Sequence, residues 1–131
     1  MRRLTVWENR YRHAAKDCFT KRVAYYHQKT GGLYSKITVR DQQSRWGSCS
    51  SRGTLSFNYR LIFAPTEVLD YVVVHELCHL THMNHSKDFW NMVERIMPDY
   101  RTHKKWLKEH GHELTLVNHL IKKGIPFNIE I

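Results

Sequence analysis

An apolar run interrupted by paired histidines constrains this chain more than any other stretch of its sequence. Residues 72–80 read VVVHELCHL, so His75 and His79 stand four positions apart with Glu76 directly after the first. On a helix, positions four apart share one face, so the two imidazoles project together with the carboxylate beside them. Because the surrounding residues are apolar, we expect a largely buried helix, in which histidine and glutamate need partners or a metal. This arrangement is typical of a catalytic zinc site.

The third zinc ligand has to come from beyond this helix. His85 lies ten residues after His75, and a continuous helix would carry it about 15 Å along the axis, far outside a ligand distance of about 2.1 Å. We therefore predict that the helix ends after His79 and that the chain turns back. Asn84 suits a left-handed turn, and Ser86 suits the N-cap of the next helix.

The predicted ligand set is therefore His75, His79 and His85. Two nearby side chains could also take part in the site. Glu94, in the following helix, is an alternative third ligand, as in zinc proteases that use a downstream glutamate. His82 falls on the ligand side if the helix continues that far, as an outer hydrogen-bond donor, an oxyanion donor or simply a polar residue at the helix end.

Three histidine ligands leave one position on the zinc open for water. The metal lowers the pKa of that water and polarises a substrate carbonyl. Glu76, adjacent but not a ligand, is predicted to take the proton as general base and pass it to the leaving amine. The prediction is a metal-dependent hydrolase of amide bonds with one zinc ion as cofactor. Four side chains are candidate oxyanion donors: Tyr59, His82, Tyr100 and His103.

The remaining sequence predicts an α+β scaffold, with a small antiparallel sheet packed on the active-site helix and several further helices. The connection 41–53 between two alternating segments is too long for a tight hairpin and holds Trp46, a candidate substrate contact. The predicted elements are a helix over 7–28, strands over 36–40 and 54–60, the active-site helix from Pro65, helices over 86–98, 99–111 and 112–123, and a terminal strand over 127–131.

Composition limits the class of protein. The chain has 131 residues, and we expect them to form one domain. It lacks an apolar run of about eighteen residues and a signal peptide, so we expect no membrane span. Three scattered cysteines favour a reducing cytoplasm over a disulfide framework. The formal net charge of +9 indicates either a solvated basic surface or a nucleic-acid partner.

Several short motifs follow one another along residues 36–111: Arg45-Trp46-Gly47-Ser48-Cys49, Asn58-Tyr59-Arg60-Leu61, residues 71–80, Asn84-His85-Ser86 with Phe89-Trp90, and Pro98-Asp99-Tyr100. Their order and spacing resemble the YgjP-like metallopeptidase family. The resemblance implies a zincin-like domain that hydrolyses protein or peptide substrates, with zinc on the three histidines and Glu76 catalytic. It also implies an edge strand that aligns the substrate beside the active-site helix, either near 55–60 or in the Trp46 loop.

The same resemblance leaves two hypotheses about function. Family members usually carry a β-rich region before the first helix, which is missing or cut away here. They are similar to SprT and Spartan proteases, which act on DNA-associated proteins. The leading hypothesis is a cytoplasmic zinc metalloprotease. The alternative is a nucleic-acid-associated basic module with a structural or vestigial zinc. Glu76 separates the two, because a structural zinc has no use for a non-ligating carboxylate beside it.

Overall fold

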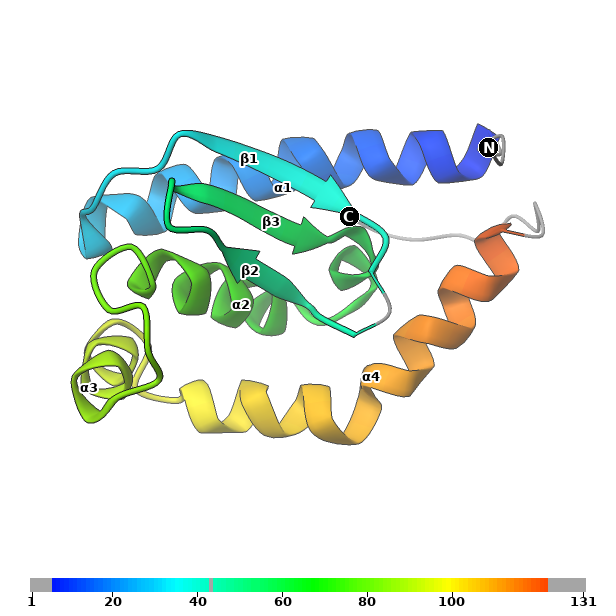
Figure 1. The fold of residues 1–131 in the computed structure, drawn as a ribbon. Coiled ribbons are helices and arrows are strands. Elements are labelled where there is room, and N and C mark those ends of the chain that lie inside the picture. Colours follow the sequence, from blue (N-terminus) through cyan, green and yellow to red (C-terminus); the bar gives the residue numbers. More distant parts are fainter. Residues whose placement is uncertain (1–5, 43, 123–131) are drawn as a thin grey trace.

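A small sheet packs against the first two helices of the chain, and the last two helices lie on the other side of the second one (Figure 1). The computed structural model describes residues 6–42 and 44–122, so the predicted strand over 127–131 lies outside the described residues. The elements in chain order are α1 (Val6–Thr30), β1 (Lys36–Arg40), β2 (Gly47–Cys49), β3 (Thr54–Asn58), a 3-10 helix η1 (Tyr59–Phe63), α2 (Thr66–Cys78), α3 (Lys87–Ile96) and α4 (Tyr100–Lys122).

The sheet is mixed, with strand order β1-β3-β2, so the prediction of an antiparallel sheet is wrong for one of its two pairings. β1 runs parallel to β3, with Ile37 opposite Leu55, whereas β2 runs antiparallel to β3, with Ser48 opposite Ser56. The connection after β1 is long enough to contain β2, and β3 then inserts between the two earlier strands. β2 has no apolar alternation, so the sequence pattern gave no sign of it.

Alternation along β3 separates a buried face from a polar one. Leu55 and Phe57 are 0% and 1% exposed, and Phe57 stacks on Phe19 of α1 with ring centroids 4.6 Å apart. Burying each such side chain contributes roughly 1.5–3 kcal/mol. Ser56 points to the other face, where its hydroxyl lies 2.7 Å from that of Thr38. The helices therefore cover the apolar face of the sheet.

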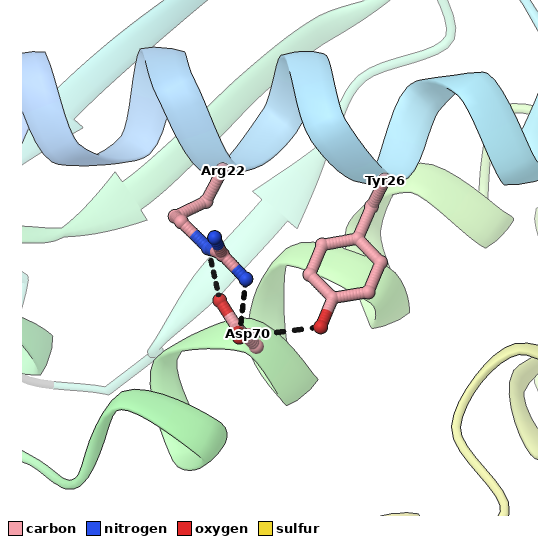
Figure 2. A network of polar contacts seen from close by, with 3 residues as sticks. All are labelled: Arg22, Tyr26 and Asp70. Atoms are coloured by element: carbon pink, nitrogen blue, oxygen red, sulfur yellow. Dashed lines mark hydrogen bonds and ion pairs between the residues drawn. The ribbon is translucent and has the colours of Figure 1, made fainter.

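An ionic contact fixes α2 against α1 (Figure 2). Arg22 interrupts the apolar stripe of α1, and its partner is Asp70 of α2. The guanidinium donates from Nε to Oδ1 at 2.7 Å and from Nη2 to Oδ2 at 2.8 Å, and the Tyr26 hydroxyl donates to Oδ2 at 3.2 Å. Three hydrogen bonds satisfy the Asp70 carboxylate, so it can be buried in the core. This contact sets the position of the helix that carries His75 and Glu76.

α4 continues from Tyr100 to Lys122, where the sequence predicted two helices that meet at Gly111. A Cβ at Gly111 would lie 2.9 Å from Cζ2 of Trp46. The glycine therefore makes room for the indole within the helix instead of ending it. The first half of the helix runs below α2 in the view, and its last turns extend toward the N-terminal end of α1 (Figure 1). None of the described helices has both the length and the apolar character required to cross a membrane.

Candidate active site

The break after the paired histidines falls where it was predicted, between the end of α2 at Cys78 and the start of α3 at Lys87. The last turn tightens, with Leu80 N–H donating to Leu77 O at 3.0 Å. Ser86 caps α3 and accepts from Phe89 N–H at 3.3 Å, as expected. The left-handed conformation predicted for Asn84 is wrong, because no described residue other than glycine has a positive φ. A tight 3-10-type turn starts the reversal instead.

The three predicted ligands meet at one point. Nε2 of His85 lies 3.2 Å from Nε2 of His79 and 3.2 Å from Nε2 of His75. One ring nitrogen from each histidine lies within 4.8 Å of the other two. Two ligands on a tetrahedral zinc at about 2.0–2.1 Å stand about 3.3–3.4 Å apart, close to both separations. The spacing of these donors therefore fits a zinc ion.

The protonation states of the imidazoles also fit a metal. His79 Nδ1 lies 2.9 Å from the backbone oxygen of His82, which can only accept, so His79 carries its proton there and offers a lone pair on Nε2. Burial, followed by the nearby His79, His85 and Lys104, lowers the pKa of His75 to about 3. Burial likewise lowers the pKa of His79. A metal binds imidazoles in their neutral form, so the lowered pKa values of His75 and His79 favour metal binding by these two rings.

Aromatic rings hold the histidines in place. Phe89 stacks on His79 at a centroid distance of 4.4 Å, and Trp90 stacks on His85 at 5.9 Å. The Tyr71 hydroxyl lies 3.4 Å from Nδ1 of His75, on the side away from the cluster. These contacts restrict ring rotation, so the donors are oriented before any ligand binds.

Glu76 lies beside the cluster as a buried carboxylate that lacks a hydrogen-bond partner among residues 6–42 and 44–122. It is 5% exposed, and a Cβ on Gly47 would lie 3.1 Å from its Oε2. Glycine therefore allows the backbone of β2 to approach the carboxylate. Burial raises the pKa of Glu76 to about 8, and Arg45 opposes that shift. The group is poised to exchange a proton near neutral pH.

Two hollows flank His75 and Glu76. The first, of about 370 Å³, extends toward α4 and includes Trp46 and Leu107 in its wall. The second, of about 310 Å³, extends toward His85 and includes Ser48 in its wall. β2 lies along both, and at the edge of the sheet its side away from β3 has no neighbouring strand within residues 6–42 and 44–122. The arrangement provides an open cleft beside the cluster.

The other candidate residues are dispersed. Glu94 is paired with Arg101 at 3.1 Å and is not part of the histidine cluster. Trp46 lines the first hollow, and the backbone of His82 supports His79. Three candidate oxyanion donors line neither hollow: Tyr59, which is buried at the start of η1, Tyr100, which stacks on Trp90, and His103, which contacts Asp99.

Sequence reasoning missed three residues at this site. Tyr71 precedes His75 by four positions and so shares its helix face, a signal that was available from spacing. Arg45 lines both hollows, although only the neighbouring Trp46 was singled out. Lys104 lies over the Trp90 ring at 4.3 Å and follows Tyr100 by four positions on α4. Only the packing of α4 against α2 shows that this lysine faces the site.

The α+β fold, with three histidines converging beside a buried glutamate, defines a zincin-like metallopeptidase. A sequence profile of the family described as "YgjP-like, metallopeptidase domain" matches residues 2–110, so the chain belongs to this family. The predicted resemblance is confirmed, and the match begins well before residue 36.

A solved structure supports the fold. The crystal structure of the metallopeptidase zymogen of Pyrococcus abyssi abylysin is similar, with a TM-score of 0.62 at 19% sequence identity. The match covers 70% of this chain and 93% of that one. No curated protein gives a significant sequence match to this chain. At that identity the likeness concerns the fold, while the family match rests on the sequence profile.

Proposed function

We propose that this protein is a zinc-dependent metalloprotease in which His75, His79 and His85 hold the metal and Glu76 transfers protons. One observation supports the proposal most directly. A carboxylate that is 5% exposed lies unpartnered, within the described residues, beside imidazoles whose Nε2 atoms converge. When bound there, a zinc ion supplies Lewis-acid activation of a water molecule and of a substrate carbonyl.

Glu76 then acts as general base and general acid in turn. Its carboxylate accepts a proton from the attacking water and later donates that proton to the nitrogen of the leaving amine. In the metal-free protein burial raises its pKa to about 8, and a cation bound beside it would favour the ionised form that accepts the proton. His75 and His79 stay neutral because burial lowers the pKa of each. The Tyr71 hydroxyl and the His82 carbonyl keep those two rings oriented.

β2 is the proposed guide for the substrate backbone. One edge of this strand pairs with β3, the other edge has no neighbouring strand within residues 6–42 and 44–122, and Gly47 allows the face of the strand to lie against Glu76. An extended peptide added along a strand edge gains main-chain hydrogen bonds without depending on its sequence. Such a peptide would pass from one hollow to the other across His75. The Trp46 loop, rather than residues 55–60, therefore provides the edge strand.

The position of Glu76 also favours an enzyme over a nucleic-acid-binding module with a structural zinc. A structural site closes its coordination with protein ligands and gains nothing from an unpaired buried carboxylate. Retaining such a group costs stability because its charged form is desolvated. Three free cysteines, Cys18, Cys49 and Cys78, support our proposal of a reducing cytoplasmic setting.

The test compares two conservative variants in the zinc-loaded protein. Glu76→Gln should keep one zinc per chain and lose about 10²–10⁴-fold in the rate of cleavage of fluorescein-labelled casein. Glu94→Gln, which removes an exposed carboxylate paired with Arg101, should retain both zinc and rate. A Glu76→Gln protein that holds zinc and cleaves at the full rate would contradict the proposed mechanism.

A further inference from the structure

The first hollow beside His75 has walls of two kinds. Its apolar wall comes from Trp46 of the loop before β2 and Leu107 of α4. The rest of the wall holds three cations, Arg45, Lys104 and Lys108, together with His75 and Glu76 of the active site. At about 370 Å³ the hollow falls in the size range of sites that accept a side chain or a small ligand. We call Arg45, Lys104, Lys108, Trp46 and Leu107 the basic hollow.

The two lysines of the basic hollow, Lys104 and Lys108, differ from the neighbouring cations of α4 in lacking an ion-pair partner among the described residues. Arg101 is paired with Glu94 at 3.1 Å, and Lys105 is paired with Glu109 at 3.7 Å. Within the described part of the chain, Lys104 and Lys108 have no carboxylate at ion-pair distance, and neither does Arg45. Trp90 supports Lys104 with its ring face, 4.3 Å from Nζ. Over residues 100–117, the lysines and arginine of α4 that lie away from the basic hollow are thus paired with carboxylates, whereas the two lysines that line it are not.

The second hollow lacks this character. Its wall near His85 carries Ser48, Cys49 and Met83, and Arg45, at the boundary, is the one lysine or arginine that it shares with the basic hollow. Apart from the metal that the histidines would hold, the lysine and arginine charge of the cleft therefore lies mainly on one side of Glu76. A peptide lying across it would meet a different field on each side of the bond being cut.

We propose that the basic hollow binds a carboxylate carried by the peptide substrate on one side of the scissile bond. This inference rests on the proposed protease function and adds a substrate class to it. The apolar wall accepts the carbon stem of the residue, and the three cations surround the charge. Two sources offer that chemistry, an acidic side chain near the cleaved bond and the C-terminal carboxylate of a short peptide. Both require that the anion reach Lys104 and Lys108 together.

Binding to the zinc-loaded Glu76→Gln protein tests the proposal without turnover. The probes are four fluorescein-labelled decapeptides of one parent sequence, with glutamate or glutamine at a central position and a free or amidated C-terminus. Fluorescence anisotropy should show about tenfold tighter binding for the peptides with the preferred carboxylate, because several weak exposed charge pairs add. A preference for central glutamate identifies the side chain as the source, and a preference for the free terminus identifies the C-terminal carboxylate.

Charge reversal locates the site. In the same background, Lys104→Glu and Lys108→Glu should each reduce the carboxylate preference about fivefold, while Lys105→Glu, with the same change in net charge, should leave it intact. Equal binding of all four peptides overturns the proposal, as does an equal loss in Lys105→Glu. Tighter binding of a single-stranded oligonucleotide, weakened equally by all three changes, would also overturn it by showing a diffuse field. Failure of wild-type hydrolysis, by contrast, would refute the protease function and leave this binding result standing.

Discussion

Two buried carboxylates lie six residues apart on α2, and they differ in their hydrogen bonding. Asp70 is 6% exposed and Glu76 is 5% exposed. Asp70 accepts three hydrogen bonds from Arg22 and Tyr26 of α1 (Figure 2), whereas Glu76 accepts none from the described residues. Burial alone therefore does not mark a functional acid. A functional acid is distinguished by burial without partners, beside a group that can use its proton.

The difference follows from what each part of α2 packs against. The side of α2 that carries Asp70 lies against α1, which supplies a guanidinium and a hydroxyl. The side with Glu76 faces β2 and the cleft, where Gly47 contributes only backbone. Desolvation is thus compensated at Asp70 and raises the pKa at Glu76 to about 8. Asp70 therefore anchors α2 to α1, while the carboxylate of Glu76 remains available for proton transfer.

The largest expected effect is on zinc affinity, through the histidine ligands beside Glu76. His85→Ala removes one of three imidazoles, so zinc affinity should fall by more than the 10–100-fold that follows loss of an outer hydrogen-bond partner. His82→Ala is the matched control, since its contribution to His79 is a backbone carbonyl that alanine retains. Competition with a chelating dye measures both affinities. Comparable losses in the two variants would show that the cluster is not the metal site.

The second prediction uses pH to separate the carboxylates. In the metal-free protein the folded pKa of Glu76 is about 8, above its ordinary value of 4.5. Between these values the unfolded chain releases a proton that the folded chain retains, so stability falls as pH rises. Glu76→Gln removes this dependence, and its stability relative to wild type should rise by on the order of 3 kcal/mol from pH 5 to pH 8.

Urea unfolding of the metal-free proteins at the two pH values measures this difference. The titration of His75 occurs in both proteins and cancels. Parallel pH profiles for wild type and Glu76→Gln would mean that Glu76 is not held protonated by burial.

The third prediction applies the reverse change to the anchored acid. Asp70→Asn leaves Arg22 facing a neutral amide and should destabilise the fold by about 2 kcal/mol, less than for a fully buried pair because the Arg22 side chain is 33% exposed. Asp17→Asn, in an exposed pair with Lys21, should cost under about 0.5 kcal/mol. Urea unfolding gives both values, and zinc binding by Asp70→Asn should be unchanged. A loss of zinc with stability intact would assign Asp70 to the site.

The smallest effect is on stability, through the contact between Gly111 and Trp46 in the wall of the basic hollow. Gly111→Ala would gain helix propensity of about 1 kcal/mol, but its Cβ would meet the Trp46 indole at 2.9 Å. The net result should be a destabilisation of about 1 kcal/mol and weaker peptide binding to the basic hollow. His112→Ala, at an exposed position of α4, should not destabilise. Stabilisation in both variants would show that Gly111 does not set the position of Trp46.

Sequence periodicity predicted the functional half of α2 better than the sheet. The four-residue spacing of His75 and His79 and the need to bring back His85 required a helix break, and the structure has it between Cys78 and Lys87. The strand that the pattern does not predict is β2, three small or polar residues that pair with β3 on the edge opposite β1. A strand of that kind is specified by its neighbours in space, which one-dimensional spacing does not record.

Two misreadings share a physical cause. Within its own segment Gly111 predicts a helix end, and Arg22 interrupts an otherwise apolar helix face. Trp46 explains the glycine and Asp70 explains the arginine, and both partners are distant in sequence. Local propensity is overridden where a long-range contact fills the space or satisfies the charge.

Anomalous diffraction from crystals of the zinc-loaded protein, collected on both sides of the zinc absorption edge, tests the central claim most directly. We predict one zinc peak at about 2.1 Å from Nε2 of His75, His79 and His85, with the Glu76 carboxylate near it but not coordinated. Asp70 should remain bound to Arg22. A peak coordinated by Glu94 or Glu76, or one away from the three histidines, would contradict the account.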